Sequence, residues 1–120
     1  MTVAQARRAD GMGWLVRDGS VLASCEVATT PRARRRGLLG RDHYEGAFVL
    51  RPCRHVHTAR MRFAIDVALC DRRGRVLAVC TLAPWRVSPL RKDTAFVVEA
   101  EAGAFDRWGL RTGDVVEYQP

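Results

Sequence analysis

The chain has 120 residues and a formal net charge of +7, with 48% hydrophobic and 28% charged residues. This length predicts one domain with a sizeable core, and the composition excludes an intrinsically disordered protein. The stretch Met1 to Arg8 lacks the apolar segment of a secretory signal, and no apolar run approaches the ~20 residues needed to cross a bilayer. We therefore expect a cytoplasmic protein without a membrane span.

The start of the chain predicts a frayed segment followed by a hairpin. Residues 1–10 are polar and rich in Ala and Arg, so we expect them to be frayed and residues 11–120 to form the domain. Asp18-Gly19 is typical of a two-residue hairpin turn, and Ser20–Ala28 is the expected returning strand. Residues 11–28 are therefore expected to begin a β-rich domain.

A short cationic helix is predicted next. Thr30 is a good N-cap residue, and Pro31 suits the first helical position. The expected helix covers Arg32–Leu39 and ends at Gly40. We expect Ala33, Leu38 and Leu39 to face inward.

The remainder of the chain reads mainly as strands. The clearest alternation starts at Met61, with Phe63, Ile65, Val67 and Leu69 on the same side, and Arg62 and Asp66 on the other. A second hairpin is expected where this strand turns back at residues 71–75. The other expected elements are the strands Ala47–Leu50, Val76–Leu82, Ala95–Glu101 and Val115–Tyr118, and a short helix within Gly103–Gly109. The fold class that these elements predict is mainly β: a compact antiparallel β-sandwich or barrel-like single domain with two short helices.

Four segments occur in the order and with the spacing of a known family pattern. They are T-P-R-A-R-R-R-G-L-L-G-R (residues 30–41), V-H-T-A-R-M-R-F-A-I-D-V-A-L-C-D-R-R-G-R-V-L (residues 56–77), V-V-E-A-E-A-G (residues 97–103) and G-L-R-T-G-D (residues 109–114). Over about residues 27–116 the chain resembles the bacterial and archaeal family called domain of unknown function 192. The resemblance implies a compact, mostly β sandwich-like fold with short helices. It implies no particular reaction, because the activity of that family is not established.

The chain departs from this family pattern in two places. The family usually has an aromatic residue before the Met of its central block, where this chain has Ala59-Arg60. We therefore do not expect this chain to share a family pocket lined by that aromatic residue. Many relatives carry a secretory signal or lipid anchor, and this chain shows neither, so no envelope role is carried over either.

The positive charge is confined to the middle of the chain. Residues 32–75 hold 12 Arg against 4 acids, whereas residues 1–31 are neutral and residues 76–120 sum to −1. Of the 20 basic residues only Lys92 is a lysine, a bias that a GC-rich coding background could also produce. We expect an anion-binding face at Arg34, Arg35 and Arg36, against the alternative of a merely solvated arginine-rich surface.

A polar cluster is expected beside that face. The candidate binding residues are His55, His57, Asp66, Arg41, Arg60 and Arg62. Asp66 is a candidate general base, but a structural ion pair or turn cap is the favoured interpretation of this residue. Glu99, within an apolar strand, has the same two interpretations, and the structural one is again favoured.

Metal binding and nucleophilic catalysis are weaker alternatives. Cys53, His55 and His57 would share one face of an extended strand, as a zinc site requires, but the neighbouring Pro52 indicates a bend. The same Cys53 and His55 could form a nucleophile and base pair, although nothing in the sequence shows one. The four cysteines lack a C-x-x-C pair and are expected to be reduced and mostly structural.

The best functional reading is therefore an accessory or ligand-binding domain whose cationic face recognises an anionic group, on a small molecule or an acidic protein partner. A metal-dependent or acid–base enzyme using His55, His57 and Asp66 is the alternative. Weak, non-specific nucleic-acid binding comes third and is not favoured, because Phe48 and Phe63 read as core and leave no stacking platform. No cofactor is expected.

Overall fold

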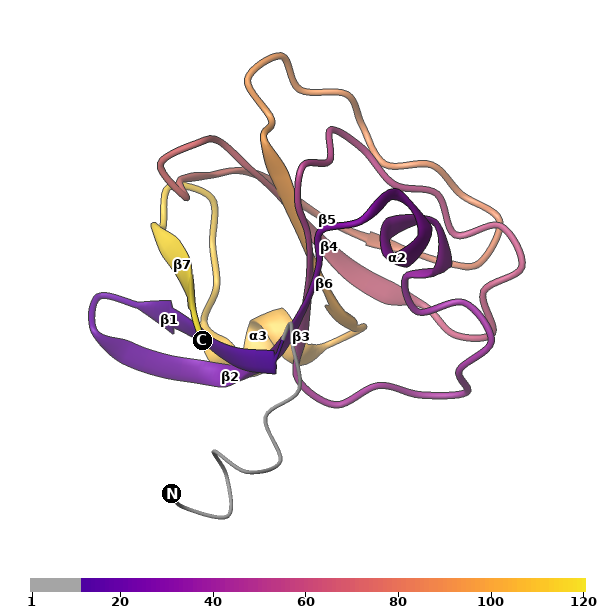
Figure 1. The fold of residues 1–120 in the computed structure, drawn as a ribbon, viewed down its shortest axis with the longest axis horizontal. Coiled ribbons are helices and arrows are strands. Elements are labelled where there is room, and N and C mark those ends of the chain that lie inside the picture. The colour runs from indigo at the N-terminus through magenta and orange to yellow at the C-terminus, as the bar shows by residue number, and fades with distance from the viewer. Residues whose placement is uncertain (1–11) are drawn as a thin grey trace.

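The computed structural model describes residues 12–120, in which seven strands form one curled sheet (Figure 1). Their spatial order is β5-β4-β6-β3-β2-β1-β7. All neighbours pair antiparallel except β2 and β3, which are parallel. The mainly β class predicted from the sequence is confirmed, whereas the prediction for residues 1–10 lies outside the described residues. The strands are β1 (Met12–Arg17), β2 (Ser20–Ala28), β3 (Ala47–Leu50), β4 (Ile65–Cys70), β5 (Val76–Leu82), β6 (Phe96–Glu101) and β7 (Val116–Gln119).

The sheet curls until its two edge strands come into contact. The Val76 N–H donates to the Asp114 carbonyl at 2.8 Å, and the Val116 N–H donates to the Gly74 carbonyl at 2.9 Å. Gly74 has a φ of +89°, and a Cβ at this position would collide with the carbonyl oxygen of Val116. Glycine is thus required where the β4–β5 turn meets the start of β7, and the result is a half-barrel.

Both faces of the central strands are buried. In Figure 1 the β1–β2 hairpin and β7 lie on one side of β4, β6 and β3, and α2 (Pro31–Arg36) lies on the other. The inner core, enclosed by the curl, contains Leu15, Val98 and Phe105. The outer core, beneath α2 and its neighbouring loops, contains Ile65 and Val97. All six residues of β4 are buried, as expected for a central strand covered on both faces.

The strand predicted from Met61 begins four residues later than expected. The Met61 N–H donates to the Thr58 carbonyl at 3.0 Å, and Arg60 adopts a φ of +64°, so a turn occupies the residues before Ile65. Within β4 the predicted alternation holds. Ile65 packs in the outer core, and Asp66 faces the opposite side.

The predicted N-cap of the first helix and the predicted end of the second are confirmed, whereas the predicted end of the first helix is wrong. The Thr30 hydroxyl accepts from the Ala33 N–H at 3.1 Å, and α2 ends at Gly37 rather than at the predicted Gly40. The second helix, α3 (Ala104–Trp108), ends at Gly109 in the left-handed conformation, as predicted. Within residues 12–120, neither helix has the length and apolar character that crossing a membrane would require.

Asp66 connects the sheet to α3 on the inner face. One carboxylate oxygen accepts from the N–H groups of Gly103 at 2.9 Å and Phe105 at 3.0 Å. The other accepts from the Thr81 hydroxyl at 2.7 Å. Gly103 has no side chain with which to cap α3, so Asp66 satisfies N–H groups at the start of this helix from a distant strand.

We expect Asp66→Ala to destabilise the fold by about 2–4 kcal/mol, because the variant leaves the buried Phe105 N–H, the Gly103 N–H and the Thr81 hydroxyl without their acceptor. Urea denaturation followed by circular dichroism measures this change. The control is Asp42→Ala, which removes an exposed ion pair with Arg62 and should cost less than about 1 kcal/mol. Equal costs for the two variants would contradict the structural role of Asp66.

Candidate functional site

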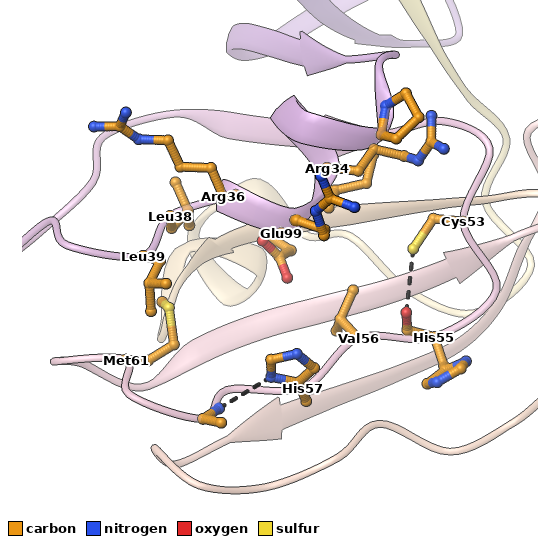
Figure 2. Close-up of a pocket in the computed structure, with 15 residues that line it drawn as sticks. Arg34, Arg36, Leu38, Leu39, Cys53, His55, Val56, His57, Met61 and Glu99 are labelled. Atoms are coloured by element: carbon orange, nitrogen blue, oxygen red, sulfur yellow. Dashed lines mark hydrogen bonds between the residues drawn. The ribbon is translucent and has the colours of Figure 1, made fainter.

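A cavity of about 310 Å³ lies between α2 and the segment 55–61 on the outer face of the sheet (Figure 2). The helix and the turn after it contribute arginines and leucines to one side of the cavity. The segment 55–61 contributes both histidines to the other side, and β6 contributes one acid. Its apolar lining includes Leu38, Leu39, Leu50, Val56 and Met61.

The segment 55–61 is held by hydrogen bonds to the loop that follows β5. Thr58 is completely buried, and its hydroxyl donates to the Ala83 carbonyl at 2.6 Å. Its backbone N–H donates to the Arg86 carbonyl at 2.8 Å. Two residues earlier, the Val56 N–H donates to the Ser88 hydroxyl at 2.9 Å. These bonds order the backbone that carries the histidines, so the cavity is pre-formed on this side.

Glu99 is the buried acid of the cavity. On β6 it lies opposite Phe48 of β3 and Val67 of β4, in the outer apolar face of the sheet. Its side chain is only 5% exposed and, within residues 12–120, makes no hydrogen bond or ion pair. Burial raises the pKa of Glu99 from its ordinary 4.5 to about 7. A carboxyl group that titrates near neutrality therefore faces the cavity (Figure 2).

Three consecutive arginines of α2 line the side of the cavity that faces the segment 55–61. Arg34 is half-buried, and its guanidinium donates to the Thr29 carbonyl at 2.7 Å. Arg35 and Arg36 are exposed, and neither guanidinium has an ion-pair or hydrogen-bond partner among the described residues. Two cations without an ion-pair partner, in the last turn of α2, thus border an apolar cavity that contains an acid able to hold its proton near neutral pH.

The two histidines differ in what they offer the cavity. The His57 Nδ1 accepts from the Ala59 N–H at 3.3 Å, which places the proton of the neutral ring on Nε2. Figure 2 shows Glu99 and His57 on opposite sides of the cavity, whereas the ring of His55 points away from Glu99. His57 is therefore the histidine placed to donate to a molecule bound here.

Cys53 shows no sign of activation. Its thiol donates to the carbonyl of His55 at 3.2 Å, not to the imidazole, and burial raises the pKa of this thiol. Neither this hydrogen bond nor the raised pKa matches a nucleophilic thiol activated by a neighbouring base. In the described residues no three His, Cys, Asp or Glu side chains gather as a metal site requires.

The remaining predicted site residues are separated from the cavity. Arg41 forms a double hydrogen bond with Glu26, at 3.1 and 3.2 Å, and lies over the Tyr44 ring. Arg62 pairs with Asp42 at 2.8 Å. Arg60 is exposed outside the cavity lining, and Asp66 faces the inner core. The structure thus brings together the arginines of α2 with the two histidines, but not with Asp66 or the other three arginines.

Glu99 is more prominent in the cavity than the sequence indicated. The signal for a functional role of Glu99 was that it is the single acid within the apolar run of residues 96–100. A purely structural role for this acid explains the same pattern. The apolar lining had no signal at all, because Leu50 and Met61 look like ordinary core residues. Their meeting around Glu99 depends on how the loops fold over the sheet.

Comparison with known proteins identifies a family whose model matches most of this chain. Residues 14–118 match the model of domain of unknown function 192 (DUF192), described as "Uncharacterized ACR". A UPF0127 protein of Pyrococcus abyssi (strain GE5 / Orsay) is 33% identical over 63 residues, which are 52% of this chain and 54% of that protein. The chain thus spans about half the length of the curated relative that it matches.

Two solved structures are similar in fold. A protein of unknown function from Novosphingobium aromaticivorans DSM 12444 is 19% identical with a TM-score of 0.74, over 98% of both chains. A "putative transcription regulator" from Sinorhizobium meliloti 1021 is 18% identical with a TM-score of 0.75, over 89% of this chain and 92% of the other. At these identities the likeness concerns the fold alone. Since the family model matches residues 14–118, which are most of the chain, the chain belongs to the DUF192 family.

Proposed function

We propose that this domain binds an amphipathic small molecule in the cavity between α2 and the segment 55–61. The anionic group of the ligand contacts Arg35 and Arg36, and its apolar part enters the cavity toward Glu99. The observation that carries the proposal is the combination of unpartnered arginines with a buried, unpartnered acid across one apolar cavity.

The cavity suits a ligand with two different ends. Leu38, Leu50 and Met61 offer apolar surface, which favours a hydrocarbon chain or ring. The guanidinium groups offer bidentate hydrogen bonds to a carboxylate or phosphate. A neutral Glu99 can donate a hydrogen bond at the inner end, and it does not repel an anion. The volume of about 310 Å³ lies at the lower end of the range for small-molecule sites.

Octanoate is a suitable probe, because it joins a carboxylate to an apolar chain. We expect Arg35→Gln with Arg36→Gln to weaken its binding about tenfold, which corresponds to about 1.4 kcal/mol. Titration followed by ¹H–¹⁵N chemical shifts gives both the affinity and the location. Arg32→Gln with Arg107→Gln removes the same charge from exposed positions outside the cavity and serves as the matched control. Equal affinities for the two double variants, or equal binding of neutral octanol, would contradict an anion-specific site.

The buried carboxyl should make stability depend on pH in a defined direction. The raised pKa means that folded Glu99 holds its proton at pH values where the unfolded chain has lost it. This group therefore lowers the free energy of unfolding as pH rises from about 4.5 to about 7, by on the order of 3 kcal/mol in total.

Glu99→Gln removes that contribution, so the variant should gain stability relative to the wild type between pH 5 and pH 8. Urea denaturation at several pH values measures the difference. Glu101→Gln, at the half-buried end of the same strand, is the matched control. Parallel pH profiles for Glu99→Gln and the wild type would show that Glu99 is not a desolvated acid.

Acid–base catalysis is the second candidate function, and Glu99 rather than Asp66 would be its base. Every oxygen of the Asp66 carboxylate already accepts hydrogen bonds, whereas Glu99 is free and titrates near pH 7 opposite His57. A 2-oxo acid such as 2-oxohexanoate has acidic protons at C3 and an anionic end for the arginines. We expect the wild type, but not Glu99→Gln, to speed exchange of these protons in D₂O, as followed by ¹H NMR. Equal exchange rates with both proteins would exclude this activity for Glu99.

A further inference from the structure

A second depression, separate from the cavity, is assembled from three loops distant in sequence. Residues 52–54, 71–73 and 90–95 line an open groove of about 900 Å³. Its cationic side chains are Arg54, Arg72, Arg73, Arg91 and Lys92, and its acids are Asp71 and Asp93, which leaves a lining charge of +3 from five cations and two acids. None of the cationic side chains was a candidate site residue in the sequence.

These cations lie on a well-supported backbone. One Asp71 carboxylate oxygen accepts from the N–H groups of Arg73 and Arg75, both at 2.9 Å, and so shapes the turn that carries Arg72. The Cys53 N–H donates to the Ala95 carbonyl at 3.0 Å, which joins two of the three loops. One Asp71 oxygen is therefore engaged by its own turn, and the charge of this carboxylate is already included in the lining charge of +3.

The cationic side chains of the groove form no ion pair with its two acids or with any other described residue. Among residues 12–120 the ion pairs involve Arg17, Arg41 and Arg62, and none of these lines the groove. Five unpaired cations on three converging loops repel one another, and an anion bound among them would relieve that repulsion.

A buried hydroxyl at the groove also lacks a partner. Thr94 lines the groove and is 7% exposed, and its side-chain oxygen is the one fully buried polar side-chain atom without a hydrogen bond in the described part of the chain. Such groups are rare in folded proteins and call for an explanation. If a rotation about the Cα–Cβ bond turns this hydroxyl toward the groove that Thr94 lines, the hydroxyl becomes available to a ligand oxygen.

We propose that this groove binds the phosphate groups of an oligophosphate or a phosphorylated small molecule, with Thr94 donating a hydrogen bond at its base. Arginine is well suited to phosphate, since its planar fork makes two parallel hydrogen bonds to neighbouring oxygens. The groove lining contains no aromatic residue, so stacked nucleic-acid bases are not its natural occupant. This site is independent of the ligand proposed for the cavity, although Cys53 borders both.

Inorganic tripolyphosphate is the probe, with binding measured by isothermal titration calorimetry. We expect Arg72→Gln with Arg91→Gln to weaken binding at least tenfold. Arg32→Gln with Arg107→Gln removes equal charge elsewhere and should weaken binding less than twofold. Thr94→Val keeps the shape of the side chain, and we expect it to weaken binding several-fold while raising the midpoint of urea denaturation, because it removes an unsatisfied hydroxyl.

Three outcomes would overturn the proposal. Equal losses in the two double variants would mean that tripolyphosphate responds only to net charge. Unchanged affinity of Thr94→Val would remove Thr94 from the site. If a single-stranded 12-nucleotide DNA bound the groove and tripolyphosphate failed to displace it, the groove would be a nucleic-acid contact rather than a small-phosphate site. Octanoate binding in the cavity tests the other proposal and does not depend on any of these results.

Discussion

The burial of the central strands on both faces is the constraint on which the rest of the structure depends. Because the sheet curls around one core and carries a second core beneath α2, β4 and β6 have no solvent-facing side. Any acid on these strands must find donors or remain desolvated. Asp66 and Glu99 illustrate the two outcomes. Asp66 accepts three hydrogen bonds on the inner face, whereas Glu99 has none on the outer face and holds its proton to higher pH.

Two acids of the same sheet, Asp66 and Glu99, therefore differ in what they do for the fold. Asp66 ties β4 to the start of α3 and to Thr81, so its carboxylate is fully occupied by the fold. Glu99 contributes nothing comparable to stability, and its burial costs free energy whenever it ionises. Carboxyl groups with strongly perturbed pKa values cluster at functional sites, although structural networks also perturb them. Glu99 is therefore the residue around which the candidate cavity is best understood.

The arginines also fall into two groups, those that form an ion pair with an acid and those that form none. Arg41 and Arg62 are neutralised by Glu26 and Asp42, and Arg17 by Asp114 at 3.0 Å. Those that line the cavity and the groove have no such partners. The excess charge of residues 32–75 is thus not one continuous face. Some of its arginines form structural ion pairs, others line two separate depressions that adjoin at Cys53, and Arg60 lies outside both groups.

Local sequence determined most of the secondary structure. Thr30-Pro31, Asp18-Gly19 and Gly109 act through the conformations of their own backbones, and each marks an element boundary that the structure confirms. Boundaries that depend on distant contacts were predicted less well. The strand expected from Met61 starts at Ile65, because the Thr58 carbonyl, buried against the loop after β5, holds Met61 in a turn.

The sequence by itself thus determined a mainly β domain, its two short helices and the confinement of positive charge to residues 32–75. Only the tertiary structure decided which of those charges remain free, and that Glu99 rather than Asp66 is the unpartnered acid. The physical reason is that alternation along a strand specifies which side chains share a face. It does not specify what covers that face, and hydrogen-bond partners and desolvation depend on the covering segments.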